Sequence, residues 1–253
     1  MKLEHKISGE GKPLIILHGL FGSLDNWQTH ARKLSEYFQV ILVDQRNHGH
    51  SPWSEEFDYG LMANDLLELM DDLGIEKAYL LGHSMGGKTV MQFTEKHPER
   101  VEKLIVADIG FKKYPLHHQQ IIAGMDAISA TERNSRSAAE QLLSEYVPEA
   151  GTRQFIMKNL YWVDKTQLGW RFNLEVLKRE MPNILGEIEL TESWIPTLFI
   201  RGEKSNYIVD EDLESIEEKY PDMQLVTIEN AGHWVHAEAP DVFMNAVLEF
   251  LLR

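Results

Sequence analysis

Short runs of apolar residues alternate with amphipathic segments along most of the chain. Several runs are apolar throughout, as Leu14-Ile15-Ile16-Leu17 is, which is typical of strands buried on both faces of a parallel sheet. The amphipathic segments carry apolar residues at helical spacing, as residues 59–73 do. The predicted strands are 13–17, 40–43, 78–81, 103–107, 197–200 and 224–228, and the predicted helices are 25–37, 59–73, 85 to a point before Pro98, 210–219 and 240–251.

This alternation predicts an α/β fold in which one mostly parallel central sheet has helices on both faces. The pattern changes between residues 111 and 194, where no convincing strand appears. We therefore expect a core formed by residues 1–110 and 195–253 and an inserted, all-helical lid formed by residues 111–194. The helices expected in the lid lie near 116–128, 135–146, 152–161 and 174–185.

A Gly-x-Ser-x-Gly sequence centred on Ser84 lies between a predicted strand and a predicted helix. In such a strand-to-helix turn the central residue has a strained backbone, and the glycines, here Gly82 and Gly86, let neighbouring backbone pass close by. The central side chain is then exposed near the positive end of a helix, where an oxyanion is stabilised. We predict that Ser84 is a nucleophile; the alternative is a glycine-rich turn with an exposed serine.

A serine nucleophile needs a base within hydrogen-bond reach, and the base needs an acid that fixes its tautomer. His233 follows the last predicted strand in a loop that contains Gly232, and reactive groups of open parallel sheets gather at such strand ends. We predict that His233 is the base, with His236 as the close competitor. The other strand-end histidines, His18 and His48, lie in loops with other roles, His83 lies on the opposite side of the turn, and His5, His30, His97, His117 and His118 are interpreted as surface or helix residues.

The acid is the contested member of the triad. The usual pattern places an aspartate at position 205, where this chain has Ser205. Asp108 ends the strand that follows the nucleophile strand, and a carboxylate there can approach the same imidazole from the neighbouring side. We predict that Asp108 is the acid, with Asp210 and Glu203 as alternatives; the other interpretation of Asp108 is a cap for the turn that follows it.

An oxyanion hole needs two backbone donors. Met85, which follows the nucleophile, is predicted to supply one. The loop after residue 17 contains Gly19 and Gly22 and is predicted to supply the other from Leu20 or Phe21. The polar residues that follow the second predicted strand are interpreted as structural: Asp44, Arg46, His48 and Ser51.

Several large side chains of the predicted lid and its surroundings are candidate walls of a substrate pocket. They are Trp162, Trp170 and Trp234, with packing inside the lid as the alternative role for each. Arg171, together with Lys112 and Lys113, is a candidate for binding a phosphate-rich leaving group locally.

Composition limits the classes of function. The chain has 253 residues, 43% of them hydrophobic, and a net charge of −15 that repels nucleic acids. It has no cysteine, which excludes disulfides, thiolate metal sites and a cysteine nucleophile. No apolar signal region follows Met1, and the most apolar run, 14–17, is too short to cross a bilayer. We expect a cytoplasmic protein with no metal or cofactor and no membrane or nucleic-acid partner, either a monomer or a dimer.

These motifs together resemble the α/β-hydrolase fold and, more narrowly, the small bacterial esterases of the YbfF type, which are related to a mitochondrial abhydrolase group. The narrower resemblance lies in HGLFGSLDN at 18–26, QRNHG at 45–49, GHSMGGK at 82–88, WRFN at 170–173 and HWVHAE at 233–238. It implies a serine esterase or thioesterase for short to medium acyl chains, acyl-CoA included, and an acid at the position of Asp108. One departure is Ile109-Gly110-Phe111, where a small residue and then proline would be expected.

Other functions remain open for the same residues. A serine at position 84 argues against dehalogenase and epoxide hydrolase chemistry, which would require a carboxylate nucleophile. The same triad could cleave a carbon–carbon bond or transfer an acyl group to an acceptor other than water. The chain could also be a ligand-binding receptor of this fold.

Overall fold

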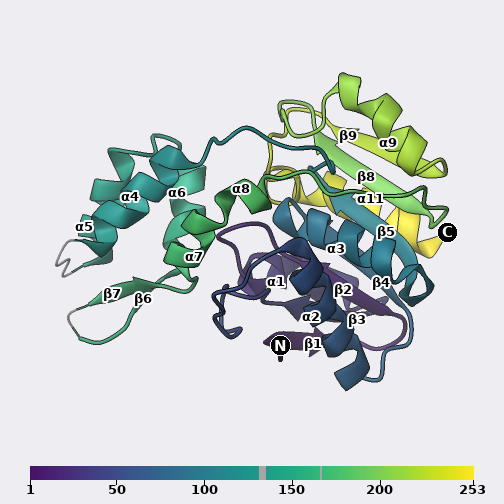
Figure 1. Ribbon diagram of the computed structural model, residues 1–253, viewed down its shortest axis with the longest axis horizontal. Helices are drawn as coiled ribbons and strands as arrows, with labels where there is room; N and C mark the ends of the chain where they lie inside the picture. The colour runs from purple at the N-terminus through teal and green to yellow at the C-terminus, as the bar shows by residue number, and fades with distance from the viewer. Residues whose placement is uncertain (131–134, 166) are drawn as a thin grey trace.

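A computed structural model describes residues 1–130, 135–165 and 167–253. Seven strands form one sheet in the order β1-β3-β2-β4-β5-β8-β9 (Figure 1). β1 is antiparallel to β3, and every other neighbouring pair is parallel. The strands are β1 (His5–Ser8), β2 (Pro13–Leu17), β3 (Gln39–Val43), β4 (Ala78–His83), β5 (Val101–Ala107), β8 (Thr197–Gly202) and β9 (Met223–Ile228).

Helices cover both faces of the sheet, which explains why its strands are continuously apolar. In β2, Leu14 and Ile16 pack in one core cluster with α1 and α11, whereas Ile15 and Leu17 pack in the other with α2 and α3. Burying each such side chain contributes about 1.5–3 kcal/mol. The helices of the core are η1 (Leu24–Trp27), α1 (Gln28–Leu34), α2 (Tyr59–Asp72), α3 (Met85–Lys96), η2 (Pro98–Arg100), η3 (Asp210–Asp212), α9 (Leu213–Lys219), α10 (Val235–Glu238) and α11 (Pro240–Leu252).

All six predicted strands are present, and the sequence pattern missed β1 (His5–Ser8). No residue of β1 is fully buried, because the strand lies at the edge of the sheet. An edge strand with exposed side chains has no apolar pattern by which it could be recognised.

Residues 111–194, which we call the insert, connect β5 to β8 and lie to one side of the sheet (Figure 1). The expectation of an all-helical segment is wrong, since two three-residue strands form an antiparallel pair. Strands this short carry too few residues for a recognisable alternation. The insert contains α4 (Gln119–Ser129), α5 (Arg136–Ser144), α6 (Ala150–Met157), β6 (Leu160–Trp162), β7 (Leu168–Trp170), α7 (Leu174–Arg179) and α8 (Met181–Ile184).

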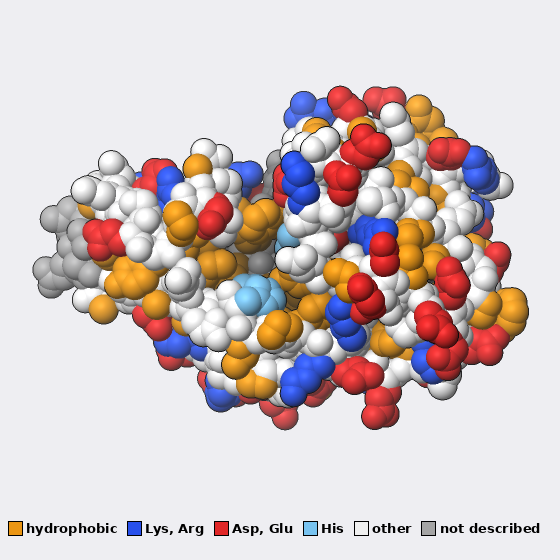
Figure 2. All heavy atoms as spheres, turned by 90° about the horizontal axis from the view of Figure 1, so that it is seen from above, with side chains coloured by type: hydrophobic (Ala, Val, Ile, Leu, Met, Phe, Trp, Pro, Cys, Tyr) orange, Lys and Arg blue, Asp and Glu red, His pale blue; other side chains and the backbone are white. Residues whose placement is uncertain are grey.

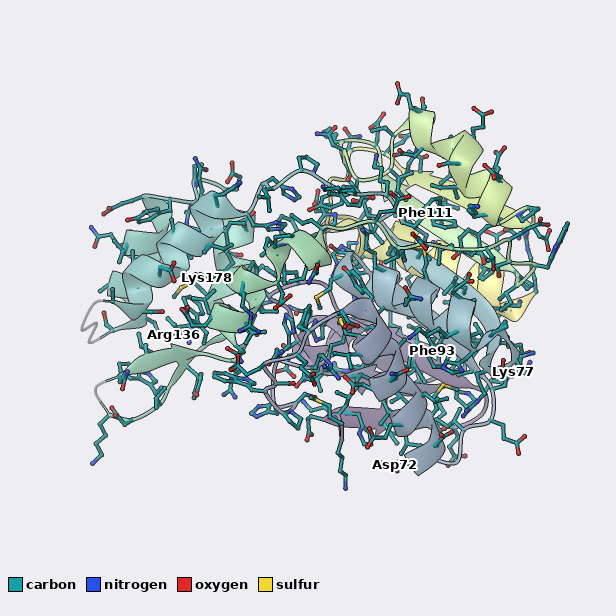
Figure 3. The ribbon with its side chains drawn as sticks, in the orientation of Figure 1. Asp72, Lys77, Phe93, Phe111, Arg136 and Lys178 are labelled. Atoms are coloured by element: carbon teal, nitrogen blue, oxygen red, sulfur yellow. The ribbon has the colours of Figure 1, made fainter. Side chains whose placement is uncertain are left out.

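Cationic side chains connect the parts of the insert to one another (Figure 3). Arg136 on α5 donates to the carbonyl oxygen of Met157 at 2.5 Å and to that of Leu160. Lys178 on α7 lies 2.9 Å from the Asp126 carboxylate on α4. These bonds join elements that lie far apart in the sequence.

A buried lysine on α3 holds both ends of the insert to the core. The Lys88 ammonium donates to the carbonyl oxygen of Lys112 at 2.8 Å and to that of Gly186. Two residues before Gly186, the carbonyl oxygen of Ile184 accepts a hydrogen bond from the Tyr59 hydroxyl at 2.7 Å. The core therefore fixes both connections of the insert.

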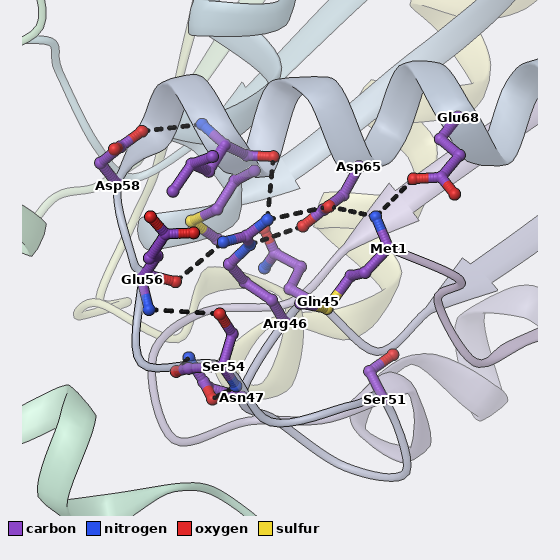
Figure 4. A network of polar contacts seen from close by, with 12 residues as sticks. Met1, Gln45, Arg46, Asn47, Ser51, Ser54, Glu56, Asp58, Asp65 and Glu68 are labelled. Atoms are coloured by element: carbon purple, nitrogen blue, oxygen red, sulfur yellow. Dashed lines mark hydrogen bonds and ion pairs between the residues drawn. The ribbon is translucent and has the colours of Figure 1, made fainter.

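The loop after β3 is held by a buried ion pair (Figure 4). Arg46 donates from Nε to Asp65 Oδ2 at 2.6 Å and from Nη2 to Oδ1 at 2.9 Å, and a third nitrogen reaches the carbonyl oxygen of Glu56 at 2.8 Å. The Arg46 and Asp65 side chains are 6% and 3% exposed. Asp44 accepts hydrogen bonds from the backbone of Leu24 and His50 in the same region.

Replacing Asp65 with alanine is expected to destabilise the fold by about 3–5 kcal/mol, because it leaves the Arg46 charge buried and unpaired. The free energy of unfolding from urea titration measures this loss. Asp25→Ala is the control, since Asp25 pairs with Lys6 on the surface, with side chains 64% and 55% exposed, and such pairs contribute less than about 1 kcal/mol. Equal losses in the two variants would contradict this interpretation of the buried pair.

Candidate active site

Ser84 lies at the sharp turn between β4 and α3. Its backbone has φ +53° and ψ −121°, a strained conformation for a residue with a side chain. Close backbone packing requires the flanking glycines: a Cβ atom on Gly86 would lie 2.5 Å from the carbonyl oxygen of Leu17, and one on Gly82 would lie 2.2 Å from that of Gly86. The geometry is that of a nucleophile elbow.

Asp108 and His233 form a hydrogen-bonded pair next to this turn. His233 Nδ1 lies 2.8 Å from Asp108 Oδ2, and because a carboxylate only accepts, Nδ1 carries the proton. Burial lowers the pKa of His233 below its ordinary value. The imidazole is therefore neutral at pH 7, and its Nε2 is available to accept a proton.

Asp108 is completely buried, and three groups donate to its carboxylate. Oδ1 accepts from the Gly202 amide at 3.0 Å, and Oδ2 accepts from the Ser205 hydroxyl as well as from His233. Burial raises the pKa of Asp108 to about 6, while the hydrogen bonds from Ser205 and Gly202 lower it. Ser205, at the position where an acid is usual, thus helps to keep the Asp108 carboxylate ionised.

The predicted oxyanion-hole residues surround Ser84, and the structure favours one of the two alternatives in the loop after β2. The Phe21 amide already donates to His48 Nε2 at 3.2 Å, and His48 Nδ1 lies 2.9 Å from the carbonyl oxygen of Arg46. No described residue accepts a hydrogen bond from the Leu20 amide. The Met85 amide is in the first turn of α3, where helix amides have no intrahelical partner. Leu20 and Met85 are therefore the better pair of donors.

Histidine side chains are visible on the surface where the insert meets the core (Figure 2). Three cavities that share lining residues lie there, around Ser84 and His233. The central cavity is lined by both residues and by Phe155 and Ile156 of α6. The inner cavity is lined by Ser84 but not by His233, and the outer cavity is lined by His233 but not by Ser84. Ser84 and His233 thus face one central space, with a further cavity on each side.

Comparison with known proteins agrees with this geometry. A family model described as the alpha/beta hydrolase fold matches residues 12–130. The chain is 38% identical over 240 residues to the esterase YbfF of Escherichia coli strain K12, a match that covers 94% of this chain and 92% of YbfF. The chain belongs to the α/β-hydrolase family. The hydrolase is also 38% identical over 251 residues to the sn-1-specific diacylglycerol lipase ABHD11 of Mus musculus, covering 94% of this chain and 80% of that protein.

Among solved structures, a marine microorganism esterase shares 43% sequence identity with this hydrolase. The two superpose with a TM-score of 0.95, covering 98% of this chain and 99% of the other. The predicted fold class and the resemblance to YbfF-type esterases are confirmed. Within the described residues, no group of histidine and acidic side chains could hold a metal ion, and no helix is long and apolar enough to span a membrane.

Of the four predicted pocket residues, the structure places only Trp234 against these three cavities of the hydrolase. Trp170 stacks on Phe172 inside the insert, and Trp162 is 43% exposed on β6. Arg171 lies beside His50, 2.9 Å from its Nε2. The prediction that Trp162, Trp170 and Arg171 line the pocket is therefore corrected. These residues lie in the β6–β7 pair or directly after it, and this pair places their side chains inside the insert or on another surface.

Two further residues of the hydrolase, not predicted from the sequence, lie against His233 or line the cavities. Tyr207 stacks on the His233 ring at 3.8 Å between centroids, and no motif marks it. His118 lines all three cavities, although it was interpreted as a surface or helix residue. The only available signal was its place just before the first helix of the insert.

Substituting Ser205 tests whether its hydroxyl lowers the pKa of Asp108. Ser205→Ala removes a hydrogen bond that lowers the pKa of Asp108, so this pKa should rise above about 6 and more of the carboxyl should be neutral near pH 6. We expect the acidic limb of the pH profile of kcat/KM, which reports groups in the free enzyme, to move to higher pH. Ser205→Thr keeps a hydroxyl and serves as the control. An unchanged acidic limb in Ser205→Ala would contradict this role.

Proposed function

We propose that this hydrolase is a serine esterase that cleaves carboxylic esters of short to medium acyl chains through an acyl-enzyme. The observation that supports this proposal most strongly is the hydrogen bond between His233 and the buried Asp108, with 2.8 Å between Nδ1 and Oδ2. Ser84, with its strained backbone, lines the same cavity as His233. The similarity to YbfF, an esterase, and to a diacylglycerol lipase supports ester bonds as the target.

The proposed reaction has two halves that use the same groups. Ser84 Oγ attacks the carbonyl carbon while His233 Nε2 takes its proton, and the amides of Leu20 and Met85 stabilise the oxyanion. His233 then gives that proton to the leaving oxygen as the carbon–oxygen bond breaks. Water attacks the acyl carbon while His233 takes one of its protons. As the bond between the acyl carbon and Ser84 Oγ breaks, His233 gives that proton to Oγ, and the carboxylic acid is released. Asp108 stabilises the imidazolium in both halves.

In this proposal the insert acts as the lid over the site. Its α6 contributes Phe155 and Ile156 to the central cavity, and Ile184 and Leu185 close the inner cavity from the other end of the insert. We therefore keep the division into a core of residues 1–110 and 195–253 and a lid of residues 111–194.

The surroundings of the cavities favour an ester over acyl-CoA as the substrate. Among the described residues, no lysine or arginine lines the three cavities, so none of them offers a charge for the phosphates of coenzyme A. Lys112 pairs with Asp212 at 2.5 Å, and Arg171 lies elsewhere. A thioester with a small uncharged leaving group fits the same site. The absence of cysteine supports a reducing compartment such as the cytoplasm.

Labelling with a fluorophosphonate probe and turnover of p-nitrophenyl butanoate test the proposal. The wild-type protein should be labelled and active, whereas Ser84→Ala should lose the label and all but a trace of turnover, because the variant lacks the proposed nucleophile. Ser144→Ala, which alters an exposed serine at the end of α5, is the control and should behave as wild type. An unlabelled wild-type serine would favour a receptor, and labelling without ester turnover would favour a carbon–carbon bond hydrolase.

A further inference from the structure

His83 directly precedes Ser84 and ends β4, the middle strand of the sheet. Its side chain is buried, and its Nε2 lies 2.9 Å from the carbonyl oxygen of His233. Because a carbonyl oxygen only accepts, Nε2 carries the proton and donates the hydrogen bond. One hydrogen bond therefore joins the residue next to the nucleophile to the backbone of the proposed base, and it leaves the imidazole of His233 free for Asp108 and the cavity.

The His83 ring is packed against two parts of the site. It lies against the rings of His233 and His236, with 4.7 Å and 4.6 Å between centroids. It also lies close to the loop after β2, since a Cβ atom on Gly19 would be 2.9 Å from His83 Nδ1 and 3.2 Å from Ser84 Cβ. The ring is therefore held between the segment that carries the base and the loop that is predicted to supply an oxyanion donor.

The His83 ring is neutral in this position. Burial lowers its pKa to about 3, and the neighbouring His233 ring contributes to the same shift. In the proposed reaction His233 becomes an imidazolium, and a second positive charge beside it would oppose that step. A neutral His83 can hold the backbone of His233 without this repulsion.

Glu238 also binds the backbone on either side of His233, but it acts within one segment of the chain. Its carboxylate accepts hydrogen bonds from the amides of Gly232 at 2.7 Å and Trp234 at 3.2 Å. Because all these residues belong to the same loop and short helix, their bonds fix the shape of the loop. The bond from His83 instead fixes the place of the loop against β4.

A similar hydrogen bond lies three residues further along the chain. His30 Nε2, on α1, lies 2.9 Å from the carbonyl oxygen of His236, and both residues are buried. The bonds from His83 and His30 thus have the same donor atom, acceptor type and length, and they differ in which residue they hold. The chain itself therefore offers a matched control for the bond to His233.

We propose that His83 is a positioning residue that sets the distance between Ser84 and His233 through its hydrogen bond to the backbone of His233. This inference rests on the esterase function proposed above. Displacing a reacting group by about 1 Å can lower a rate about 10²-fold, so a bond that fixes this distance affects catalysis. Because His83 exchanges no proton in the reaction, its effect belongs to the acylation rate and not to substrate binding.

Two amide substitutions of different reach test this role. The amide nitrogen of glutamine extends about as far as histidine Nε2, whereas that of asparagine extends only as far as Nδ1. His83→Asn should lose the bond to His233 and lower the single-turnover acylation rate at saturating p-nitrophenyl butanoate by up to about 100-fold. The ester concentration that gives the half-maximal rate should change little. His83→Gln should restore most of the rate.

His30→Asn is the control, because it removes the matching bond to His236. It should lower the free energy of unfolding in urea titration about as much as His83→Asn does, yet acylate at a rate near that of the wild type. A wild-type acylation rate in a folded His83→Asn, or equal losses of rate in His83→Asn and either of the other two variants, would overturn the inference. If the wild-type protein is neither labelled by a fluorophosphonate nor active on p-nitrophenyl butanoate, the esterase proposal itself has failed.

Discussion

The site depends on one buried carboxylate. Asp108 is completely buried, and an ionised carboxylate without partners would be very costly there. Its partners come from three parts of the fold: Gly202 at the end of β8, Ser205 in the following loop, and His233 in the loop after β9. Satisfying this charge therefore brings His233 to the edge of the sheet where Ser84 follows β4.

The same position also determines where the insert begins. The chain leaves the core just after Asp108 and returns at β8, the neighbour of β5 in the sheet. Lys88 holds both connections through backbone carbonyls. The insert is thereby fixed close to Ser84, Asp108 and His233, and the start of its first helix places His118 among the cavities. The position of Asp108 and the start of the insert are thus both set by the end of β5.

The sequence predicts the parts of this protein that follow from local pattern. Buried strands such as β2 are continuously apolar, and the glycines around Ser84 require a close backbone turn, so both were recognisable. Edge strand β1 and the short β6–β7 pair leave no such pattern. The choice between Leu20 and Phe21 depends on a hydrogen bond to His48 from a distant loop. Aromatic residues of the insert, such as Trp170, pack inward, and composition alone does not distinguish that role from a pocket wall.

The proposal that Asp108 is the acid of the triad is tested most directly by the rate of acylation of Ser84 in an Asp108→Asn variant, measured by single-turnover kinetics with p-nitrophenyl butanoate. An amide leaves the geometry nearly intact but favours the wrong histidine tautomer, and the corresponding change in a serine protease lowers kcat about 10⁴-fold. We predict that Asp108→Asn lowers the acylation rate by a similar factor. Asp210→Asn should change it little, since Asp210 is 80% exposed and pairs with Arg201. Near-normal acylation in Asp108→Asn, or a comparable loss in Asp210→Asn, would contradict it.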